Sequence, residues 1–288
     1  MKLKTKNLLE NIVHGIFLVL GLVTVASVLL ITVYLIVSGI PAIKEIGIPD
    51  FLLGKKWAST AAEPSYGILP FILTSVYGTA GAIVLGVPVG FMAAVYLAKM
   101  ADKRVRAVVV EAVSLLAGIP SVVYGLVGMM VLVPGIRKVF NVPDGASLLA
   151  AIIVLAIMIL PSIIKVSMTS LEAVPREYED ASLALGATPT ETYFRVSVPA
   201  AKSGIAAAVV LGVGRAIGAV MMVSGNAPNM PELFQSVRFL TTAVASEMSY
   251  SSGLQRQALF SIALVLFLFI MLINATLNFL LKRDKSNG

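Results

Sequence analysis

Long apolar blocks, separated by short polar intervals, follow one another along the whole 288-residue chain. Six of them approach or exceed the roughly 20 residues that a helix needs to cross about 30 Å of hydrocarbon. The pattern therefore predicts an all-α integral membrane protein with six transmembrane helices. The six blocks cover residues 12–38, 68–98, 107–133, 147–164, 203–224 and 258–281.

Two of these blocks contain residues that disturb helices. The second is longer than a bilayer requires and holds Pro70 and Pro88, so we expect a break, a tilt or a re-entrant start there. In the third, Gly118 and Pro120 are expected to unwind the helix and expose backbone groups. Such groups are tolerated in a membrane only beside protein or a water-filled path. The third block is thus a candidate path element, although a plain kink fits the sequence equally well.

The composition fits a membrane protein and excludes several kinds of site. Hydrophobic residues make up 58% of the chain, charged residues only 13%, and the mean hydropathy is +0.95. A soluble domain carries about 25% charged residues. The chain has no cysteine, which rules out disulfides, thiolate catalysis and cysteine metal sites, and His14 is its one histidine. We expect no bound metal and no cofactor.

No catalytic motif is recognisable in the sequence. The nearest feature to a phosphate-binding P-loop, Gly54 followed by Lys55 and Lys56, lacks the required spacing and hydroxyl. The chain is therefore predicted not to be an enzyme, and any ATP that drives it must be hydrolysed by another subunit. A self-contained channel or ion-driven carrier is the alternative. Such a carrier usually has acids within its spans, and Glu111, near a span end, is the one weak candidate.

Basic residues next to the spans predict the orientation. With the N-terminus in the cytoplasm, 14 of the 22 lysines and arginines fall in inside segments and 7 in outside segments, and the remaining one is Arg215. Both termini are then cytoplasmic. Lys2, Lys4 and Lys6 before the first block resemble a signal peptide, but the apolar run is too long, which favours an uncleaved anchor. The net charge of +7 reflects this topology and attraction to anionic lipid, and no patch favours nucleic acid.

The connection between the fourth and fifth blocks, residues 165–202, is unusually polar and is predicted to form two short helices. The first begins after Pro175 and ends at Gly186, where a left-handed C-terminal cap is expected. In the second, Thr188 is the predicted N-cap and Glu191 completes a capping box. Pro199 is expected to end it.

This connection resembles the cytoplasmic loop of permeases from bacterial ABC importers, which carry an EAA-x3-G-x9-I-x-L-P motif. The spacing is kept, with aspartate for glutamate, serine for the second alanine and valine for both branched residues. The resemblance implies that residues 186–194 form a coupling helix that docks on an ATPase subunit. A solvated hairpin that only joins two spans is the simpler alternative. The matching positions are Asp180, Ala181, Ser182, Gly186, Val196, Val198 and Pro199, and Ala187, Thr188 and Glu191 belong to the same predicted coupling segment.

Further motifs extend the resemblance over about residues 50–281. They are similar to those of permease subunits from phosphate-specific ABC importers, and several motifs in the right order are more specific than any one. The motifs are YGILP (66–70), LLAGIPSVVYG (115–125), AIMILP (156–161), ALGAT (184–188) and GVGRAIG (212–218).

The resemblance implies a domain plan and a set of partners. Residues 1–66 would be an anchor helix with an external loop, and residues 67–288 the permease core of the type I ABC importer fold, with the coupling loop at 165–202. The expected partners are a second related permease, two ATP-binding subunits and a periplasmic or extracellular phosphate-binding protein. That binding protein would deliver phosphate to the outer loops at 39–65 and 225–257, in the plasma (inner) membrane of a prokaryote.

Arg215 is the most informative single residue. An arginine within a span costs about 2.5 to 3.5 kcal/mol on insertion scales, so its side chain should face protein or water. Gly218 and Ala219 share its helix face and leave room for an anion, and a guanidinium can donate two parallel hydrogen bonds to an oxyanion. The alternative is a structural ion pair, with Glu111 or with an acid of the partner. The family pattern G-R-A-x-G-E has an acid where this chain has Ala219. If the arginine and the acid form a gating pair in the family, that pair is missing here, and either full transport competence or strict phosphate specificity would be affected.

Four hydroxyl residues complete the candidate substrate path. Ser121 and Tyr124 follow the expected break in the third block. Thr74 and Ser75 lie in the second block, where hydroxyls satisfied within their own helix are the safer assumption. The sequence leaves open whether the path takes phosphate, arsenate, sulfate or molybdate.

Overall fold

The computed structural model describes residues 2–219 and 222–286, and it is almost entirely helical. Two pairs of residues form a small antiparallel hairpin, in which Trp57 pairs with Tyr66 and Ala58 with Ser65. The fold class predicted from the apolar blocks is confirmed. The α-helices and strands are α1 (Lys2–Ile46), α2 (Ile48–Leu53), β1 (Trp57–Ala58), β2 (Ser65–Tyr66), α3 (Leu69–Val95), α4 (Lys103–Gly118), α5 (Ser121–Val127), α6 (Val133–Phe140), α7 (Leu148–Glu172), α8 (Arg176–Ala184), α9 (Pro189–Thr192), α10 (Val198–Ala200), α11 (Lys202–Ile217), α12 (Leu240–Glu247) and α13 (Gly253–Ser286). Three π-helical turns, η1 (Tyr96–Met100), η2 (Gly128–Leu132) and η3 (Tyr193–Ser197), and the 3-10 turn η4 (Met222–Ser224) complete the set.

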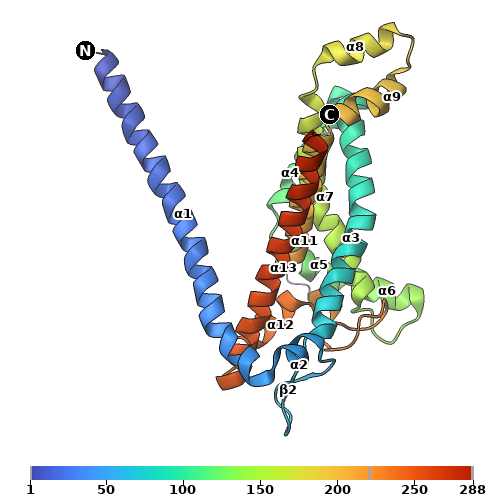
Figure 1. The fold of residues 1–288 in the computed structure, drawn as a ribbon. Coiled ribbons are helices and arrows are strands. Elements are labelled where there is room, and N and C mark those ends of the chain that lie inside the picture. Colours follow the sequence, from blue (N-terminus) through green and yellow to red (C-terminus); the bar gives the residue numbers. More distant parts are fainter. Residues whose placement is uncertain (1, 220–221, 287–288) are drawn as a thin grey trace.

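Five helices of the described chain are long and apolar enough to cross a membrane on their own. A sixth span is obtained if the arm Pro189–Ala200 and α11, which meet at a bend of 72°, count as one broken unit. In Figure 1, α8 and α9 lie at one end of the molecule, together with both chain ends, and α2, α12 and the hairpin lie at the other. We call these the inner end and the outer end, in line with the predicted orientation.

The core is built where α3 and α11 pack against α7. Apolar side chains along α7 are buried over most of its length. The helices approach closely because α3 has glycines on the contact face: a Cβ at Gly86 would lie 2.8 Å from Ile159 Cδ1, and one at Gly90 would lie 2.9 Å from Ile163 Cγ2. Small residues at such positions are what allow membrane helices to pack tightly.

Helix α1 stands apart from this core along most of its length, as Figure 1 shows. Its apolar side chains are largely exposed between Val13 and Val37, which is expected of a helix that faces lipid. It joins the core near its outer end, where the Ser261 hydroxyl donates to the Gly39 carbonyl oxygen at 2.6 Å. The rings of Tyr34 and Phe260 meet edge to face, with centroids 5.4 Å apart.

Two predictions about helix breaks had different outcomes. The break expected in the third block is present, because α4 ends at Gly118 and α5 begins at Ser121. In the second block the break that was one of the expected outcomes is absent, since α3 is one continuous helix, and the expected tilt stays a prediction. Pro70 occupies the first turn of α3, where no backbone donor is required, and Pro88 is tolerated inside the helix.

The fifth predicted block, 203–224, is shorter in the structure than in the sequence analysis. Helix α11 ends at Ile217, with Gly218 as its C-cap, and residues 220–221 of the block lie outside the described residues. Glycine is a poor helix former, and the chain leaves the helical path at this point. The loop that follows connects back to α7, because the Ser147 amide donates to the Val223 carbonyl oxygen at 3.2 Å.

Candidate functional site

The tip of the coupling loop has the local geometry that its sequence predicts. Helix α8 begins after Pro175 and stops before Gly186, whose φ of +88° lies in the left-handed region that favours glycine. The Ala187 amide donates to the Ser182 carbonyl oxygen at 3.3 Å, and the Gly186 amide to that of Leu183 at 2.9 Å. This pair of bonds defines a Schellman motif, so the predicted C-terminal cap is confirmed.

The second helix of the loop starts with the predicted capping box. The Glu191 amide donates to Thr188 Oγ1 at 3.3 Å, and the Thr188 amide donates to Glu191 Oε2 at 3.0 Å. The Thr188 amide and the Thr188 hydroxyl, which donates to Glu191 Oε2 at 2.9 Å, hold the pKa of Glu191 below its ordinary value, and the amide has the larger effect. The predicted end of this helix was slightly wrong, because the arm runs through the π-helical turn η3 and past Pro199 to Ala200 before the bend into α11.

Several loop residues are available for contact with another protein. Asp180, Ala181, Gly186 and Thr188 are exposed, while Ala187 is half-buried. Leu185 stands between the two short helices with 90% of its surface exposed. A single exposed leucine is common on protein surfaces, so its exposure makes Leu185 accessible to a partner without marking an interface by itself.

A buried polar cluster that the sequence did not predict holds this loop on the end of the second span. Lys99, in η1, forms an ion pair with Glu179 of α8, and Ser197 of η3 donates to the same carboxylate at 2.7 Å. Burial alone would raise the pKa of Glu179, but the hydrogen bonds from Lys99 and Ser197 outweigh it and hold the pKa below its ordinary value. The two arms are also joined directly, because Ser182 Oγ and Thr192 Oγ1 lie 2.9 Å apart.

Arg215 lies near the end of α11 and reaches the break in the third span. Its Nη2 donates to the Ala117 carbonyl oxygen at 3.3 Å and its Nη1 to Ser162 Oγ at 3.4 Å. The Tyr124 hydroxyl donates across the break to the Leu116 carbonyl oxygen at 2.8 Å. The Ala117 carbonyl group, released where α4 unwinds, thus receives a hydrogen bond from Arg215, which lowers the cost of leaving it unpaired. The Leu116 carbonyl oxygen accepts from both the Tyr124 hydroxyl and the Ile119 amide.

The ion pair with Glu111 that was considered for Arg215 is not found, and a pair with an acid of the partner permease stays a prediction. Glu111 is exposed, and among the described residues neither side chain has an ion-pair partner. Ala219, which stands where the family pattern has an acid, is buried in the apolar core, and its carbonyl oxygen accepts a hydrogen bond from Thr241 Oγ1 at 2.8 Å. Arg215 is therefore a half-buried cation held by neutral partners in the part of the chain that the structure describes.

The hydroxyl residues fall into two separate places. Ser121 is half-buried at the start of α5, near Tyr124 and the break. Thr74 and Ser75 lie at the outer end of α3 and are buried. The Ser75 hydroxyl accepts a hydrogen bond from the Leu240 amide at 3.1 Å, so it caps the start of α12, and the Thr74 hydroxyl has no partner among the described residues. Neither residue of this second pair forms a hydrogen bond with Arg215 among the described contacts.

Comparison with known proteins decides the family. Residues 86–284 match the model of the binding-protein-dependent transport system inner membrane component. The chain belongs to this family. It is therefore a permease subunit of an ABC importer, a multi-pass inner membrane protein that is not itself catalytic. Such a transporter also implies ATPase and binding-protein partners.

Individual relatives of the permease cover most of its length. A Bacillus subtilis protein named "Probable ABC transporter permease protein YqgH" is 38% identical over 265 residues, which is 88% of this chain and 86% of the relative. Proteins named "Phosphate transport system permease protein PstC" are 33% identical in Pasteurella multocida, covering 83% of this chain and 82% of the relative, and 32% identical in Haemophilus influenzae, covering 88% and 86%.

A solved structure confirms the fold of the permease. A chain of the inward-facing MetNI methionine ABC transporter superposes with a TM-score of 0.58 at 19% identity, covering 76% of this chain and 94% of that one. An identity this low supports the fold alone. The all-α importer fold predicted from the sequence motifs is confirmed.

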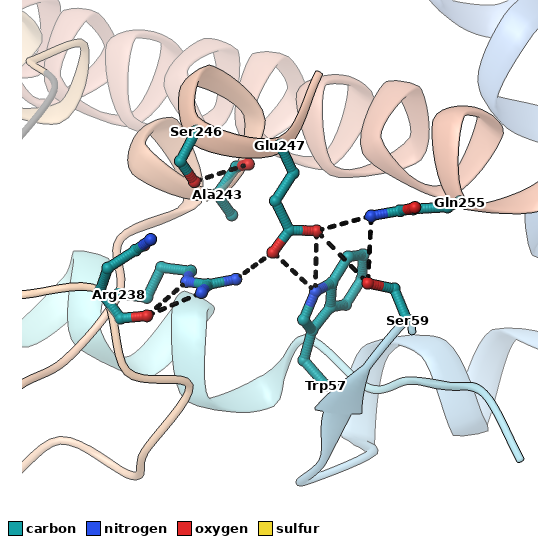
Figure 2. A network of polar contacts seen from close by, with 8 residues as sticks. Trp57, Ser59, Arg238, Ala243, Ser246, Glu247 and Gln255 are labelled. Atoms are coloured by element: carbon teal, nitrogen blue, oxygen red, sulfur yellow. Dashed lines mark hydrogen bonds and ion pairs between the residues drawn. The ribbon is translucent and has the colours of Figure 1, made fainter. Parts of the chain in front are cut away.

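The outer end of the permease holds a second buried polar cluster, which the sequence analysis missed. We call it the Glu247 cluster, and Figure 2 shows how its side chains converge on one carboxylate. Glu247 forms an ion pair with Arg238 and accepts hydrogen bonds from Trp57 Nε1 at 3.2 Å and Gln255 Nε2 at 3.1 Å. Ser59 Oγ lies 3.5 Å from the same carboxylate.

The Glu247 cluster joins segments that are distant in sequence. Trp57 belongs to the hairpin, Glu247 ends α12, and Gln255 begins α13. Arg238 also donates to the Asn226 carbonyl oxygen at 2.7 Å and lies over the ring of Phe71 in α3, 5.6 Å from its centroid. The cluster therefore fixes the loop between α11 and α12 to the outer ends of the spans.

Proposed function

We propose that this permease imports inorganic phosphate. It would form the translocation path together with a second, related permease, and two copies of a cytoplasmic ATP-binding subunit would drive it from the inner end. A phosphate-binding protein would deliver the anion to the outer end. The coupling loop, with residues from Asp180 to Glu191, would be the docking site for one ATPase subunit.

The observation that carries the proposal is the state of the Arg215 side chain. Its guanidinium is half-buried within the span region and is held by two neutral oxygen atoms, those of Ala117 and Ser162. These bonds engage two of its five N–H donors. Both are long, at 3.3 and 3.4 Å, so an anion with stronger acceptors could replace them.

The chemistry of phosphate fits this side chain. A tetrahedral oxyanion presents pairs of oxygen atoms that match the fork of a guanidinium, and charge-assisted bonds of this kind are about twice as strong as neutral ones. The relatives named as phosphate transport permeases support phosphate over other oxyanions. Sulfate and molybdate share the tetrahedral shape and form the second candidate class.

The proposed mechanism is alternating access. ATP binding by the ATPase subunits would favour the outward-facing state, and hydrolysis would reset the inward-facing one. A ligand shifts such an equilibrium only through its different affinity for the two states. The coupling loop would transmit the movement of the ATPase to the spans, and Arg215 would meet the anion at the break in the third span.

The proposal is tested by reconstitution with the subunits that co-purify. The permease complex would be placed in liposomes, and ATP hydrolysis and uptake would be measured with the binding protein and phosphate, arsenate, sulfate or molybdate. We expect phosphate to stimulate hydrolysis and to be taken up. Stimulation by sulfate or molybdate instead would assign another oxyanion, and anion flux without ATP would favour a channel.

A further inference from the structure

The second span connects the two ends of the molecule through one buried polar contact at each end. At the inner end, Lys99 of η1 pairs with Glu179 in the coupling loop. At the outer end, Ser75 of α3 accepts the hydrogen bond of the Leu240 amide, which is the first residue of α12. Between these contacts the chain is helical without interruption, through α3 and η1. The 24 residue steps from Ser75 to Lys99 span roughly 36 Å at 1.5 Å per residue.

Both contacts are largely shielded from water, so the removal of one partner from either contact is costly. The side chains of Lys99 and Glu179 are 12% and 17% exposed, and Ser75 is 4% exposed. A buried ion pair that loses one partner leaves an uncompensated charge, and a buried amide without an acceptor is similarly unfavourable. Each contact therefore keeps its two elements together when one of them moves.

The two arms of the coupling loop are joined to each other, so we expect the loop to move as one piece. Ser197 in the second arm donates to Glu179 in the first, and Ser182 and Thr192 form a second bridge. Thr192 and Ser197 are fully buried. A displacement of the loop tip is therefore passed to Glu179 and, through Lys99, to the end of the second span.

We propose that the second span, α3 with η1, is the link that carries movement from the coupling loop to α12 at the outer end. Glu179 is its inner positioning residue and Ser75 its outer one. Helix α12 in turn meets the end of α11 through the bond from Thr241 to the Ala219 carbonyl oxygen, four residues after Arg215. Movement of the ATPase subunits thus reaches the Arg215 region from the outer side. This inference rests on the proposed function as an ATP-driven importer.

The inner contact is tested by charge exchange. Glu179→Gln and Lys99→Met each break the ion pair, and the double variant Lys99→Glu with Glu179→Lys rebuilds it with reversed charges. We expect phosphate transported per ATP hydrolysed to fall at least about fivefold in each single variant, the lower end of typical coupling between sites. The ratio should recover in the double variant. Glu177→Gln, which changes an exposed carboxylate of the same helix, is the matched control and should keep the ratio.

The outer contact is tested by Ser75→Ala, which removes the acceptor of the Leu240 amide. We expect the ratio of transport to hydrolysis to fall here too, while the ATPase subunits still co-purify. The control is Ser114→Ala, because the Ser114 hydroxyl bonds only to a carbonyl oxygen of its own helix among the described contacts. Co-purification and thermal unfolding are measured for all variants, so that a loss of assembly is separated from a loss of coupling.

The outcomes distinguish this inference from the proposed function. If the wild-type complex hydrolyses ATP without taking up phosphate, the proposed function fails. If the wild type couples uptake to hydrolysis and either Glu179→Gln or Ser75→Ala keeps the wild-type ratio, the proposed function stands and the link through the second span is overturned. Lower stability with an unchanged ratio is the result expected of a purely structural contact, and it overturns the link as well.

Discussion

The inner and outer ends of the molecule are held together by contacts of different range. At the coupling loop, the capping box joins residues three positions apart, and the Ser182–Thr192 bridge joins residues ten apart. In the Glu247 cluster, the carboxylate meets Trp57 from 190 positions away and Ser59 from 188. The structure at the tip of the inner end thus depends on residues close in sequence. The contacts at the outer end form only when the spans have packed together.

This difference predicts how each end responds to damage. A change at the tip of the coupling loop should alter that loop and leave the spans in place. A change in the Glu247 cluster should loosen several elements together, because one carboxylate receives donors from the hairpin, the α11–α12 loop and α13.

The largest expected contrast is in accessibility. Because the chain has no cysteine, single cysteines can be introduced and labelled without background. A cysteine at position 104 or 185 should react only from the cytoplasmic side, and one at position 55 or 231 only from outside, as the distribution of basic residues requires. The measurement is labelling with a membrane-impermeant maleimide in intact cells and in inverted vesicles. Reversed labelling at any two sites would contradict the six-span orientation.

The largest expected energetic effect is that of Glu247→Ala. It leaves the guanidinium of Arg238, only 10% exposed, without its carboxylate, and removing one partner of a buried ion pair costs roughly 3 to 5 kcal/mol. Thermal unfolding in detergent should shift clearly downward, and protease should gain access to the hairpin. Glu232→Ala, which removes an exposed carboxylate of the nearby loop, serves as the control and should unfold like the wild type.

A more local loss is expected from Gly186→Val at the inner end. A residue with a Cβ costs about 1 to 2 kcal/mol in the left-handed conformation that Gly186 adopts, so the Schellman turn should open. Co-purification with the ATPase subunit should weaken while membrane insertion survives. Gly135→Val, at a helical position with open space around it, is a control for the added side chain. Normal co-purification and coupled transport in Gly186→Val would refute the prediction.

At the centre of the molecule, Arg215→Lys should weaken phosphate-stimulated ATP hydrolysis by about tenfold, which corresponds to the loss of one good hydrogen bond. Lysine keeps the charge but loses the planar fork. Assembly should remain intact, because the partners of Arg215 are neutral and no carboxylate is left uncompensated among the described residues. Arg137→Lys, at an exposed arginine of α6, should match the wild type. Unchanged phosphate uptake in Arg215→Lys would leave Arg215 a structural residue.

The smallest effect is a pH dependence at the second helix of the loop. The pKa of Glu191 is lowered, so its ionised carboxylate stabilises the start of this helix. This stabilisation is fully present above the ordinary glutamate pKa of 4.5 and is lost as the pH falls through the lowered value. Glu191→Gln keeps an acceptor for the Thr188 amide but removes the titration. Amide hydrogen exchange at residues 188–192 is measured for the wild type and for Glu191→Gln. The exchange rates of the two proteins should converge as the pH falls below 5. Parallel exchange at every pH would refute the effect.

Features that depend on residues close in sequence could be predicted, and features that depend on contacts between distant segments could not. The helix break after Gly118, the cap at Gly186 and the box at Thr188 depend on near neighbours, and the structure confirms them. The helical membrane fold is confirmed as well, but the third helix of the described chain that is long and apolar enough to cross a membrane is Ser121–Phe140, and not the predicted 107–133. The continuous helix through Pro88 could not be predicted, because packing against α7 decides whether a proline is tolerated. Helix α12 was missed because it is short and its start is capped by Ser75, which lies in another span.

The site was predicted by residue type but not by partner. Arg215 and Tyr124 were both selected from the sequence, yet the contacts that place them, with the carbonyl oxygens of Ala117 and Leu116, depend on how the third span unwinds. Glu179 and Glu247, the central carboxylates of the two polar clusters, resemble ordinary surface carboxylates in the sequence. A signal for Glu247 was the unusual presence of Trp57 and Arg238 in polar outer segments, since both need a buried acceptor.

The exposed tip of the coupling loop also has a consequence for the newly made protein before it assembles. If Leu185 docks on an ATPase subunit, a permease that has not yet met that subunit carries a bare leucine into the cytosol. In that case quality-control proteases and chaperones would have access to this side chain, and an orphan subunit would be removed unless its partner covered it. The same residue that would couple two subunits during transport would then also adjust how many copies of each the cell retains.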